Sequence, residues 1–195
     1  MANKKYSFKC LGQNCETQAC HFREQVNVTI DDLARWTQAG HLQNILPGLR
    51  FNLPQSENEP IAIETRRKDL EDQDGTACIF YHEKSSACEI GYNKPISCQT
   101  YPLKYNGKKF YVSDRDCPGV GEGEVTKEAL KDAKEKAEQD FHERQRTQAS
   151  LPALYSLIMG QLMQQSAQAM QNLSEEDRKR IQDIMARQEE EEEDA

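Results

Sequence analysis

The sequence has no long apolar run and few hydrophobic residues. No stretch approaches the roughly 20 apolar residues that a transmembrane helix needs, and no apolar segment follows the two lysines near its start. We therefore expect no membrane span and no leader peptide, and a cytoplasmic protein. Only 36% of the residues are hydrophobic and 30% are charged, which is little apolar material for the core of a 195-residue chain. Some interaction besides apolar burial is therefore expected to hold part of it together.

Basic clusters are also missing. The formal net charge is -8, but the acidic run from Glu189 to Asp194 accounts for -6, which leaves about -2 on residues 1–188. Nucleic-acid binding normally requires a basic patch that releases phosphate counterions, so no nucleic-acid partner is expected. Like charges cannot be buried together, and residues 189–195 are predicted to be a disordered, solubilising tail.

Familiar catalytic patterns are absent as well. The sequence contains no phosphate-binding glycine loop, no recognisable Ser-His-Asp or paired-carboxylate set and no internal repeat of solenoid length. It also has no C-x-x-C, the spacing of thioredoxin-type redox pairs and of most zinc knuckles. No catalytic residue is therefore predicted, and whether the protein is an enzyme stays open.

What the chain does contain is seven cysteines, none of them beyond residue 117. Disulfides are rare in the cytosol, and an odd number of cysteines cannot pair off within one chain. Metal ligation by thiolates is therefore the expected use. The seven form an N-terminal group of three and a distal group of four, namely Cys10, Cys15 and Cys20, then Cys78, Cys88, Cys98 and Cys117.

Four thiolates around one centre suit both structural zinc and a 4Fe-4S cluster, although single cysteines can also be buried free thiols. The missing C-x-x-C favours iron–sulfur, with zinc as the alternative. Seven ligands are one short of two four-cysteine sites. His21 is a candidate for the eighth ligand because it directly follows Cys20. It is a weak candidate, since adjacent residues seldom point at one centre. Cys117, beside Pro118 and Gly119, is expected to share a centre with the N-terminal cysteines.

Local patterns predict an α+β fold. Residues 29–32 (Thr-Ile-Asp-Asp) form a capping-box motif that predicts a short helix ending near Gly40. Asn106-Gly107 lies between two apolar runs and predicts a hairpin with a two-residue type I′ turn. Pro95 is expected to open a helical turn that carries Cys98. Residues 52–75 are mostly polar and read as a loop around one short strand.

After residue 124 the pattern is helical. We expect one helix over residues 124–147 that is charged nearly all round, a second capped by Ser150 and a third capped by Ser174. The second presents an apolar stripe of Leu151, Leu154, Tyr155, Ile158, Met159, Leu162, Met163 and Met170. The stripe over residues 150–172 either packs on the rest of the chain or serves a protein partner or self-association.

The predicted organisation therefore has three parts. Residues 1–123 form a small, irregular, metal-centred cysteine-cluster domain with an antiparallel hairpin, 124–188 a mainly helical extension and 189–195 the acidic tail. Because no cysteine follows residue 117, the extension is expected to be dispensable for metal binding.

Several motifs together suggest a family. They are Phe8-Lys-Cys10, Val28-Thr29-x-x-Asp32-x-x-Arg35, Cys78-Ile-Phe80, Cys88-Glu-Ile90, Lys94-Pro95-x-x-Cys98-x-x-Tyr101-Pro102 and Cys117-Pro118-Gly119-x-Gly121-x-Gly123. From Phe8 to Gly123 the chain resembles the YkgJ-type cysteine-cluster family, a zinc- or iron-chelating domain written CxxCxxCC. Two departures are the four-residue gaps between the first cysteines and Lys94 in place of an arginine.

The resemblance implies metal chelation, and it extends distantly to flagellin lysine methylases, which combine a similar cluster with methyl transfer from S-adenosylmethionine. The sequence has no glycine-rich turn for that cofactor. The function expected is that of an iron–sulfur protein with a redox or methyl-transfer-linked role. The alternative is a structural zinc domain that acts as a protein-interaction adaptor through its helical extension.

Overall fold

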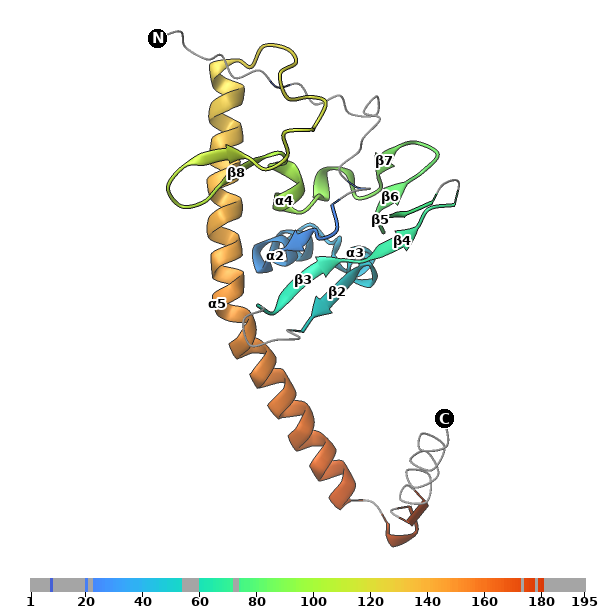
Figure 1. The fold of residues 1–195 in the computed structure, drawn as a ribbon. Coiled ribbons are helices and arrows are strands. Elements are labelled where there is room, and N and C mark those ends of the chain that lie inside the picture. The colour runs from blue at the N-terminus through green and yellow to red at the C-terminus, as the bar shows by residue number, and fades with distance from the viewer. Residues whose placement is uncertain are drawn as a thin grey trace. The chain divides into compact units, whose positions relative to one another are not determined.

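The computed structural model describes Phe8, Cys20 and residues 23–53, 60–71, 74–172, 174–177 and 179–180. Cys10, Cys15, His21 and the predicted tail at 189–195 lie outside these residues. The chain divides into two compact units, 1–151 and 152–195. Helices and small antiparallel sheets are mixed along the chain, which confirms the α+β class (Figure 1). Within the described ranges, no helix is long and apolar enough to cross a membrane.

Within the described residues of the first unit, the strands form four small antiparallel sheets. The largest has the order β1-β3-β2, from Asn27–Val28, Ala62–Thr65 and Leu49–Asn52. Three two-stranded ladders follow: β4 (Arg67–Asp69) with β5 (Thr76–Cys78), β6 (Tyr81–His82) with β7 (Ala87–Cys88), and β8 (Leu103–Tyr105) with β9 (Phe110–Val112).

The prediction of a loop with one short strand over residues 52–75 was wrong. This stretch holds both β3 and β4, and neither strand has the apolar alternation of a half-buried strand. Strand β3 pairs with residues 27–28 and 49–52 on its two sides, and β4 pairs with residues 76–78. These strands therefore depend on hydrogen-bonding partners supplied by other segments.

The predicted capping box is present and opens helix α2 (Ile30–Gln38). The Asp32 backbone N–H donates to Thr29 Oγ1 over 3.0 Å, and the Thr29 backbone N–H donates to Asp32 Oδ2 over 2.9 Å. The helix ends before Gly40, whose φ of +72° lies in the left-handed region that glycine adopts readily. The helix and both of its ends are confirmed. Two short helical segments, α3 (Leu42–Ile45) and η2 (Leu46–Gly48), lead from it to β2.

The predicted hairpin is present as β8 and β9, but its turn differs from the prediction. Residues 106–109 separate the two strands, so the loop is longer than a two-residue type I′ turn. The Asn106 side-chain oxygen accepts hydrogen bonds from the backbone N–H groups of Lys108 and Lys109, over 3.1 and 3.0 Å. This side-chain turn takes the place of the tighter one.

The predicted helical turn near Cys98 is also present. A 3₁₀ turn, η3 (Gly91–Asn93), leads into helix α4 (Ile96–Gln99). Pro95 is the residue that precedes the helix, with ψ of 146°, and is not its first helical residue as predicted. The Cys98 backbone N–H donates to the Pro95 carbonyl over 2.8 Å, which holds this cysteine on a rigid turn.

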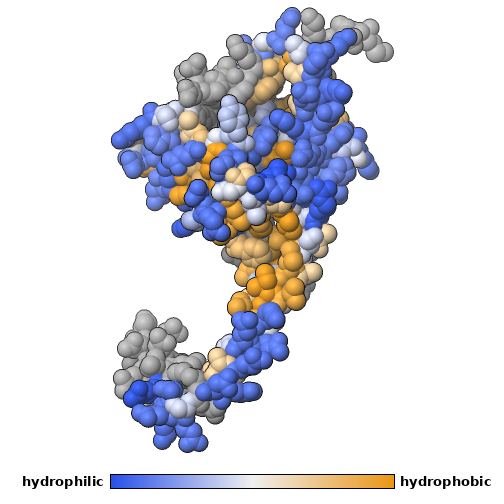
Figure 2. Space-filling model, turned by 180° about the vertical axis from the view of Figure 1, so that it is seen from behind, coloured by the Kyte–Doolittle hydropathy of each residue, from blue (hydrophilic) through white to orange (hydrophobic). Residues whose placement is uncertain are grey.

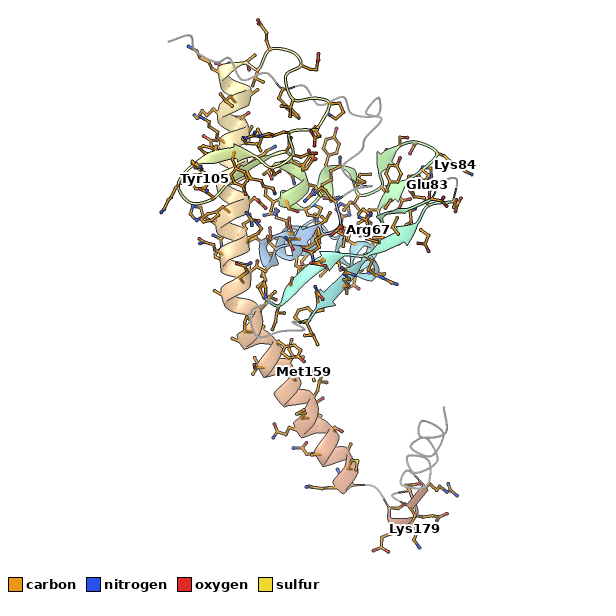
Figure 3. The ribbon with its side chains drawn as sticks, viewed as in Figure 1. Arg67, Glu83, Lys84, Tyr105, Met159 and Lys179 are labelled. Atoms are coloured by element: carbon orange, nitrogen blue, oxygen red, sulfur yellow. The ribbon has the colours of Figure 1, made fainter. Side chains whose placement is uncertain are left out.

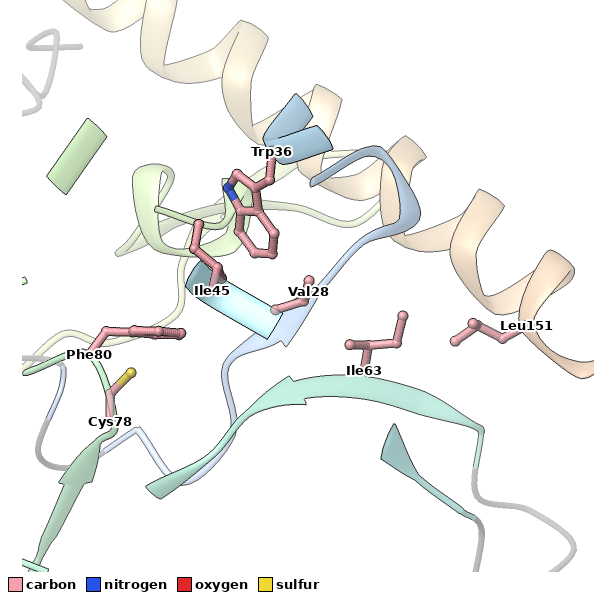
Figure 4. Packing of buried hydrophobic residues seen from close by; sticks show 7 residues of the cluster. All are labelled: Val28, Trp36, Ile45, Ile63, Cys78, Phe80 and Leu151. Carbon is pink, nitrogen blue, oxygen red and sulfur yellow. The ribbon is translucent and has the colours of Figure 1, made fainter. Parts of the chain in front are cut away.

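The core of the first unit is small and draws on many elements. Its buried cluster is Val28, Trp36, Ile45, Ile63, Cys78, Phe80 and Leu151 (Figure 4). The Trp36 indole N–H donates to the Asn93 carbonyl over 2.7 Å, so this large side chain is buried with its polar atom satisfied. The cluster therefore joins α2 and the sheets, and it includes one of the cysteines.

A close backbone contact at Gly48 leads to a first prediction. A Cβ at this position would lie 2.3 Å from Phe80 Cζ and 3.0 Å from Ile79 Cγ2, and Phe80 is buried. Gly48→Ala should lower the free energy of unfolding by about 1–3 kcal/mol, as overpacked cores do. Denaturant titration measures it, and the loss should shrink in a Phe80→Leu background, where the clashing atoms are removed. An equal loss in both backgrounds would contradict the steric explanation.

The three helices predicted after residue 124 are largely one. Helix α5 spans Lys127–Gln171 and contains Pro152, so Ser150 is not a helix cap. Proline removes one backbone hydrogen bond, but strong helix formers stand on both sides and Leu151 is fixed in the core. The predicted cap at Ser174 is present, where the Asp177 backbone N–H donates to Ser174 Oγ over 3.1 Å.

The first part of α5 belongs to the first unit and is not a solvated helix. Ala137, Asp140, Glu143, Thr147 and Leu151 are buried on it. The helix runs beside α2 and the β8–β9 hairpin (Figure 1). Tyr105 of β8 (Figure 3) packs edge-on against Phe141, with ring centroids 5.5 Å apart. The sequence pattern predicts a segment that is charged nearly all round and solvated, but two of its carboxylates, Asp140 and Glu143, are buried.

These carboxylates are held by cations from two distant segments and by one on the same helix. Arg35 of α2 forms a bidentate ion pair with Glu143, with Nη1–Oε1 and Nη2–Oε2 distances of 2.7 and 3.0 Å. Asp140 lies 3.1 Å from Lys104 Nζ and 3.2 Å from Arg144 Nε. Buried charges require such partners, so the first part of α5 is packed together with α2 and β8 in one unit.

The Glu143 pair leads to a second prediction, on pH. Burial opposes ionisation of Glu143, but hydrogen bonds from Arg35 and Gln139 outweigh burial and lower its pKa. A lowered pKa contributes stability that is present above the unfolded-state pKa and is lost as the pH falls through the folded-state value. The stability difference between wild type and Glu143→Gln should therefore be full above about pH 6 and narrow below about pH 4. If the stability difference between wild type and Glu143→Gln is the same at every pH, the lowered pKa of Glu143 is contradicted.

Candidate metal centre

Four cysteines from separate segments lie close enough to interact electrostatically. Cys78 ends β5, Cys88 lies in β7 and Cys98 in α4, and the fourth is Cys20. Burial raises the pKa of the Cys20 thiol to about 12, and the neighbouring Cys78, Cys98 and Cys88 thiols add to the rise. One N-terminal cysteine is therefore grouped with three cysteines of the distal set.

Cys98 has a cationic partner. Burial raises the pKa of its thiol, and Arg23, which donates from Nη1 to the sulfur over 3.5 Å, acts in the opposite direction. The same guanidinium lies 5.2 Å from the centroid of the Tyr101 ring. Arg67 of β4 donates to the Arg23 carbonyl, which fixes the backbone of this segment. The hydrogen bond from Arg23 therefore offsets part of the rise in the Cys98 pKa that burial causes.

Cys88 shares a second cation with Cys20. Burial raises the pKa of the Cys88 thiol, while the Ile90 backbone N–H and Lys94 act to lower it. Lys94 has the same effect on Cys20. Both side chains pack against the core cluster, so each thiol combines apolar surroundings with the electrostatic effect of Lys94.

Cys78 is the most deeply placed of the four, with 7% of its surface exposed, and it belongs to the core cluster (Figure 4). Its thiol donates to the hydroxyl of Thr65, the last residue of β3, over 3.5 Å. The side chain therefore has a polar partner although it is buried.

A buried lysine joins this region to α5. Burial lowers the pKa of Lys104, and its ion pair with Asp140 opposes that effect. The ammonium also donates to the Ser97 carbonyl and to Thr100 Oγ1, each over 3.3 Å, and it favours the charged form of Cys98. The second carboxylate oxygen of Asp140, Oδ1, is buried with no hydrogen-bond partner among the described residues.

Sequence reasoning named the cysteines but not the three cations around them, Arg23, Lys94 and Lys104. Lys94 lies in a motif that was noted, four residues before Cys98. Nothing in the local sequence marks Arg23 or Lys104, because each reaches the thiols only through the folding of distant segments.

Cys117 lies apart from the interactions that link the four thiols. It begins a turn in which the Val120 N–H donates to the Cys117 carbonyl over 2.9 Å. It also contributes electrostatically to a raised pKa of Tyr101. Burial raises the pKa of Tyr101, helped by its hydrogen bond to Asp114 and by the Cys117 charge. Val120 also forms an isolated antiparallel bridge with Phe8. Phe8 is thereby joined to the turn that begins at Cys117, while Cys10 lies outside the described residues.

The described residues contain no closed ligand set. No group of three or more His, Cys, Asp or Glu side chains within them has the arrangement of a metal site. The donor types nevertheless fit, because four thiols suit a tetrahedral zinc or a cubane iron–sulfur cluster.

A hollow of about 560 Å³ lies elsewhere in the first unit. Polar side chains of the β1-β3-β2 sheet and α5 line it, among them Asn27, Arg50, Glu64 and Arg144. The cations in it are already paired, Arg50 with Glu64 over 2.8 Å and Arg144 with Asp140. None of the described cysteines lines this hollow, so it is separate from the thiol group.

Comparison with known proteins adds no relative. No protein-family model, no curated protein and no solved structure matches the chain.

Proposed function

We propose that this protein binds metal through clustered cysteine thiolates, with an iron–sulfur centre as the preferred occupant and zinc as the alternative. The observation that carries the proposal is the grouping of Cys20, Cys78, Cys88 and Cys98, brought from four segments into one electrostatic neighbourhood. Four is the number of thiolates that a cubane cluster or a structural zinc takes. Buried free thiols need no such convergence.

The surroundings of the sulfurs support the same proposal. Four thiolates around one metal accumulate negative charge, and Arg23, Lys94 and Lys104 are placed to offset it. The Ile90 N–H directed at Cys88 is the type of backbone donor that tunes metal-bound thiolates. When bound, the group would supply either electron transfer or a structural cross-link, and these residues would hold and neutralise it.

A second centre is proposed around Cys117. The bridge between Phe8 and Val120 joins the segment next to Cys10 to the segment next to Cys117. Cys10, Cys15 and Cys117, with His21 as a weak fourth candidate, are the remaining ligand candidates. A shared centre there would link the two ends of the cysteine-bearing region across a long loop.

The biological role we propose is redox or linked to methyl transfer, in the manner of the cysteine-cluster family that the motifs resemble. No residue is assigned to catalysis. The alternative is a zinc-stabilised adaptor that binds a protein partner through residues 150–172, which the exposed leucines and methionines of that helix favour.

Protein purified without oxygen, combined with metal analysis and a visible spectrum, distinguishes these functions. A brown sample that contains iron and sulfide in comparable amounts, with broad visible absorption, supports the iron–sulfur role. A colourless sample with stoichiometric zinc supports the adaptor role. Protein that is folded and free of both metals would overturn the proposal.

A further inference from the structure

One segment of α5 contains no charge. Between Arg146 and Glu175 the chain has no Asp, Glu, Lys or Arg, although 30% of the whole sequence is charged. Solvated helices normally carry charged residues on their outer face. An uncharged helix is therefore expected to be covered by a partner that it binds through apolar contacts and not through ion pairs.

The same segment exposes large apolar side chains. Leu157, Ile158 and Met163 have 67%, 56% and 68% of their surface exposed, and Leu154 and Leu162 have 43% and 52%. Apolar surface gathers along this stretch of the helix (Figure 2). Such a contiguous patch, from a segment without charge, is typical of a protein interface.

The spacing of the side chains points to a helical partner. Leu151, Tyr155, Ile158, Leu162, Gln165 and Ala169 are separated by alternating intervals of four and three residues. This is the heptad spacing of a coiled-coil seam, in which side chains of one helix fit between those of another. Leu151 is buried in the core of the first unit, so the available seam lies beyond it.

We infer that residues 154–171 form a parallel, in-register pair with the same segment of a second copy of this chain. The positions that flank the seam, among them Leu154, Met159 (Figure 3) and Gln161, are neutral, so two identical helices meet without repulsion. Gln165 is the one strongly polar residue within the seam. In a parallel pair it lies opposite its own copy, where the two amides hydrogen-bond to each other.

This inference is independent of the proposed metal centre, because no cysteine lies in the segment. The seam covers little more than two heptads, so the pair is weak. Sedimentation velocity of the full chain should show a monomer–dimer equilibrium with a dissociation constant on the order of micromolar. Metal content measured on the same samples keeps a failure of metal binding distinguishable from a failure of dimerisation.

Two charge variants test the seam. Leu162→Glu places an unpaired charge in it and should raise the dissociation constant by at least about 100-fold. Gln164→Glu adds the same charge outside the seam and should change the dissociation constant by less than about threefold. Circular dichroism controls for helix content in both. A wild type that is monomeric at the highest concentration, or a dimer that tolerates Leu162→Glu, overturns the inference.

A mixing experiment tests orientation and register. Gln165→Glu and Gln165→Lys should each be monomeric, because each places like charges opposite one another in a parallel pair. An equimolar mixture should restore the dimer as a Glu–Lys pair. If neither variant weakens the wild-type equilibrium, or if the mixture stays monomeric, the parallel in-register pairing is overturned.

Discussion

Asp32→Ala is expected to lower the free energy of unfolding by about 3–5 kcal/mol, the range for removing one partner from a buried charge pair. Its carboxylate is fully buried. Oδ2 accepts from the Thr29 backbone N–H over 2.9 Å, Oδ1 accepts from the Ile96 N–H over 3.0 Å, and Arg35 pairs with it. The substitution therefore removes the cap of α2, leaves a buried N–H at the start of α4 unsatisfied and loosens the charge network to α5.

Asp31→Ala is the matched control for this substitution. Asp31 is the neighbouring residue in the first turn of the same helix, and it pairs with Arg146 across 3.1 Å where both side chains are partly exposed, 36% and 60%. Exposed pairs contribute little, so the loss should stay below about 1 kcal/mol. Urea titration of both variants measures the contrast. Similar losses at the two positions would mean that the buried network adds no more than the general charge of the helix end.

Cys98→Ser is expected to remove the metal bound by the proposed Cys20, Cys78, Cys88 and Cys98 centre almost completely. Serine keeps the size of the side chain but replaces the thiolate that the metal requires. Because metal-binding free energy is part of folding free energy in small metal domains, the thermal midpoint should fall by on the order of 10 °C. Metal analysis, the visible spectrum and thermal unfolding under anaerobic conditions give the three measurements.

Cys117→Ser is the matched control, because it makes the same chemical change outside the group of four. It should leave the metal of that group in place and remove only the second, proposed centre, with faster hydrogen exchange near the N-terminus. Retention of full metal content by Cys98→Ser would refute the four-thiol centre. Complete loss of metal in both variants would indicate a single centre that all these cysteines share.

The packing of α5 bears on whether the helical extension is needed for metal binding. Because no cysteine follows residue 117, the helical extension was expected to be unnecessary for metal binding. Residues 127–151 instead bury Asp140 and Glu143 against Lys104 and Arg35. A chain that ended near Gly123 would leave Lys104, which acts on Cys98, buried without its carboxylate. Truncation after Leu151 is therefore the cut that preserves the first unit.

Features that depend on a few neighbouring residues could be determined from the sequence by itself. The capping box of α2 needs only Thr29 and Asp32, the turn before Cys98 needs Pro95, and Asn106-Gly107 located the hairpin. Each rests on hydrogen bonds or backbone preferences within about four residues, so the local sequence contains the necessary information. The length of the hairpin loop was missed, because Asn106 has two alternative ways to form a turn.

The tertiary structure alone decided which charges are inside and which cysteines interact electrostatically. On a helical pattern Asp140 and Glu143 look like solvent-facing residues, and only Arg35 and Lys104, from distant segments, make their burial stable. In the same way, spacing separated Cys20 from the distal cysteines, and chain folding brought it within electrostatic range of three of them. Local sequence does not encode such contacts, because the free energy that stabilises them comes from partners that folding brings together.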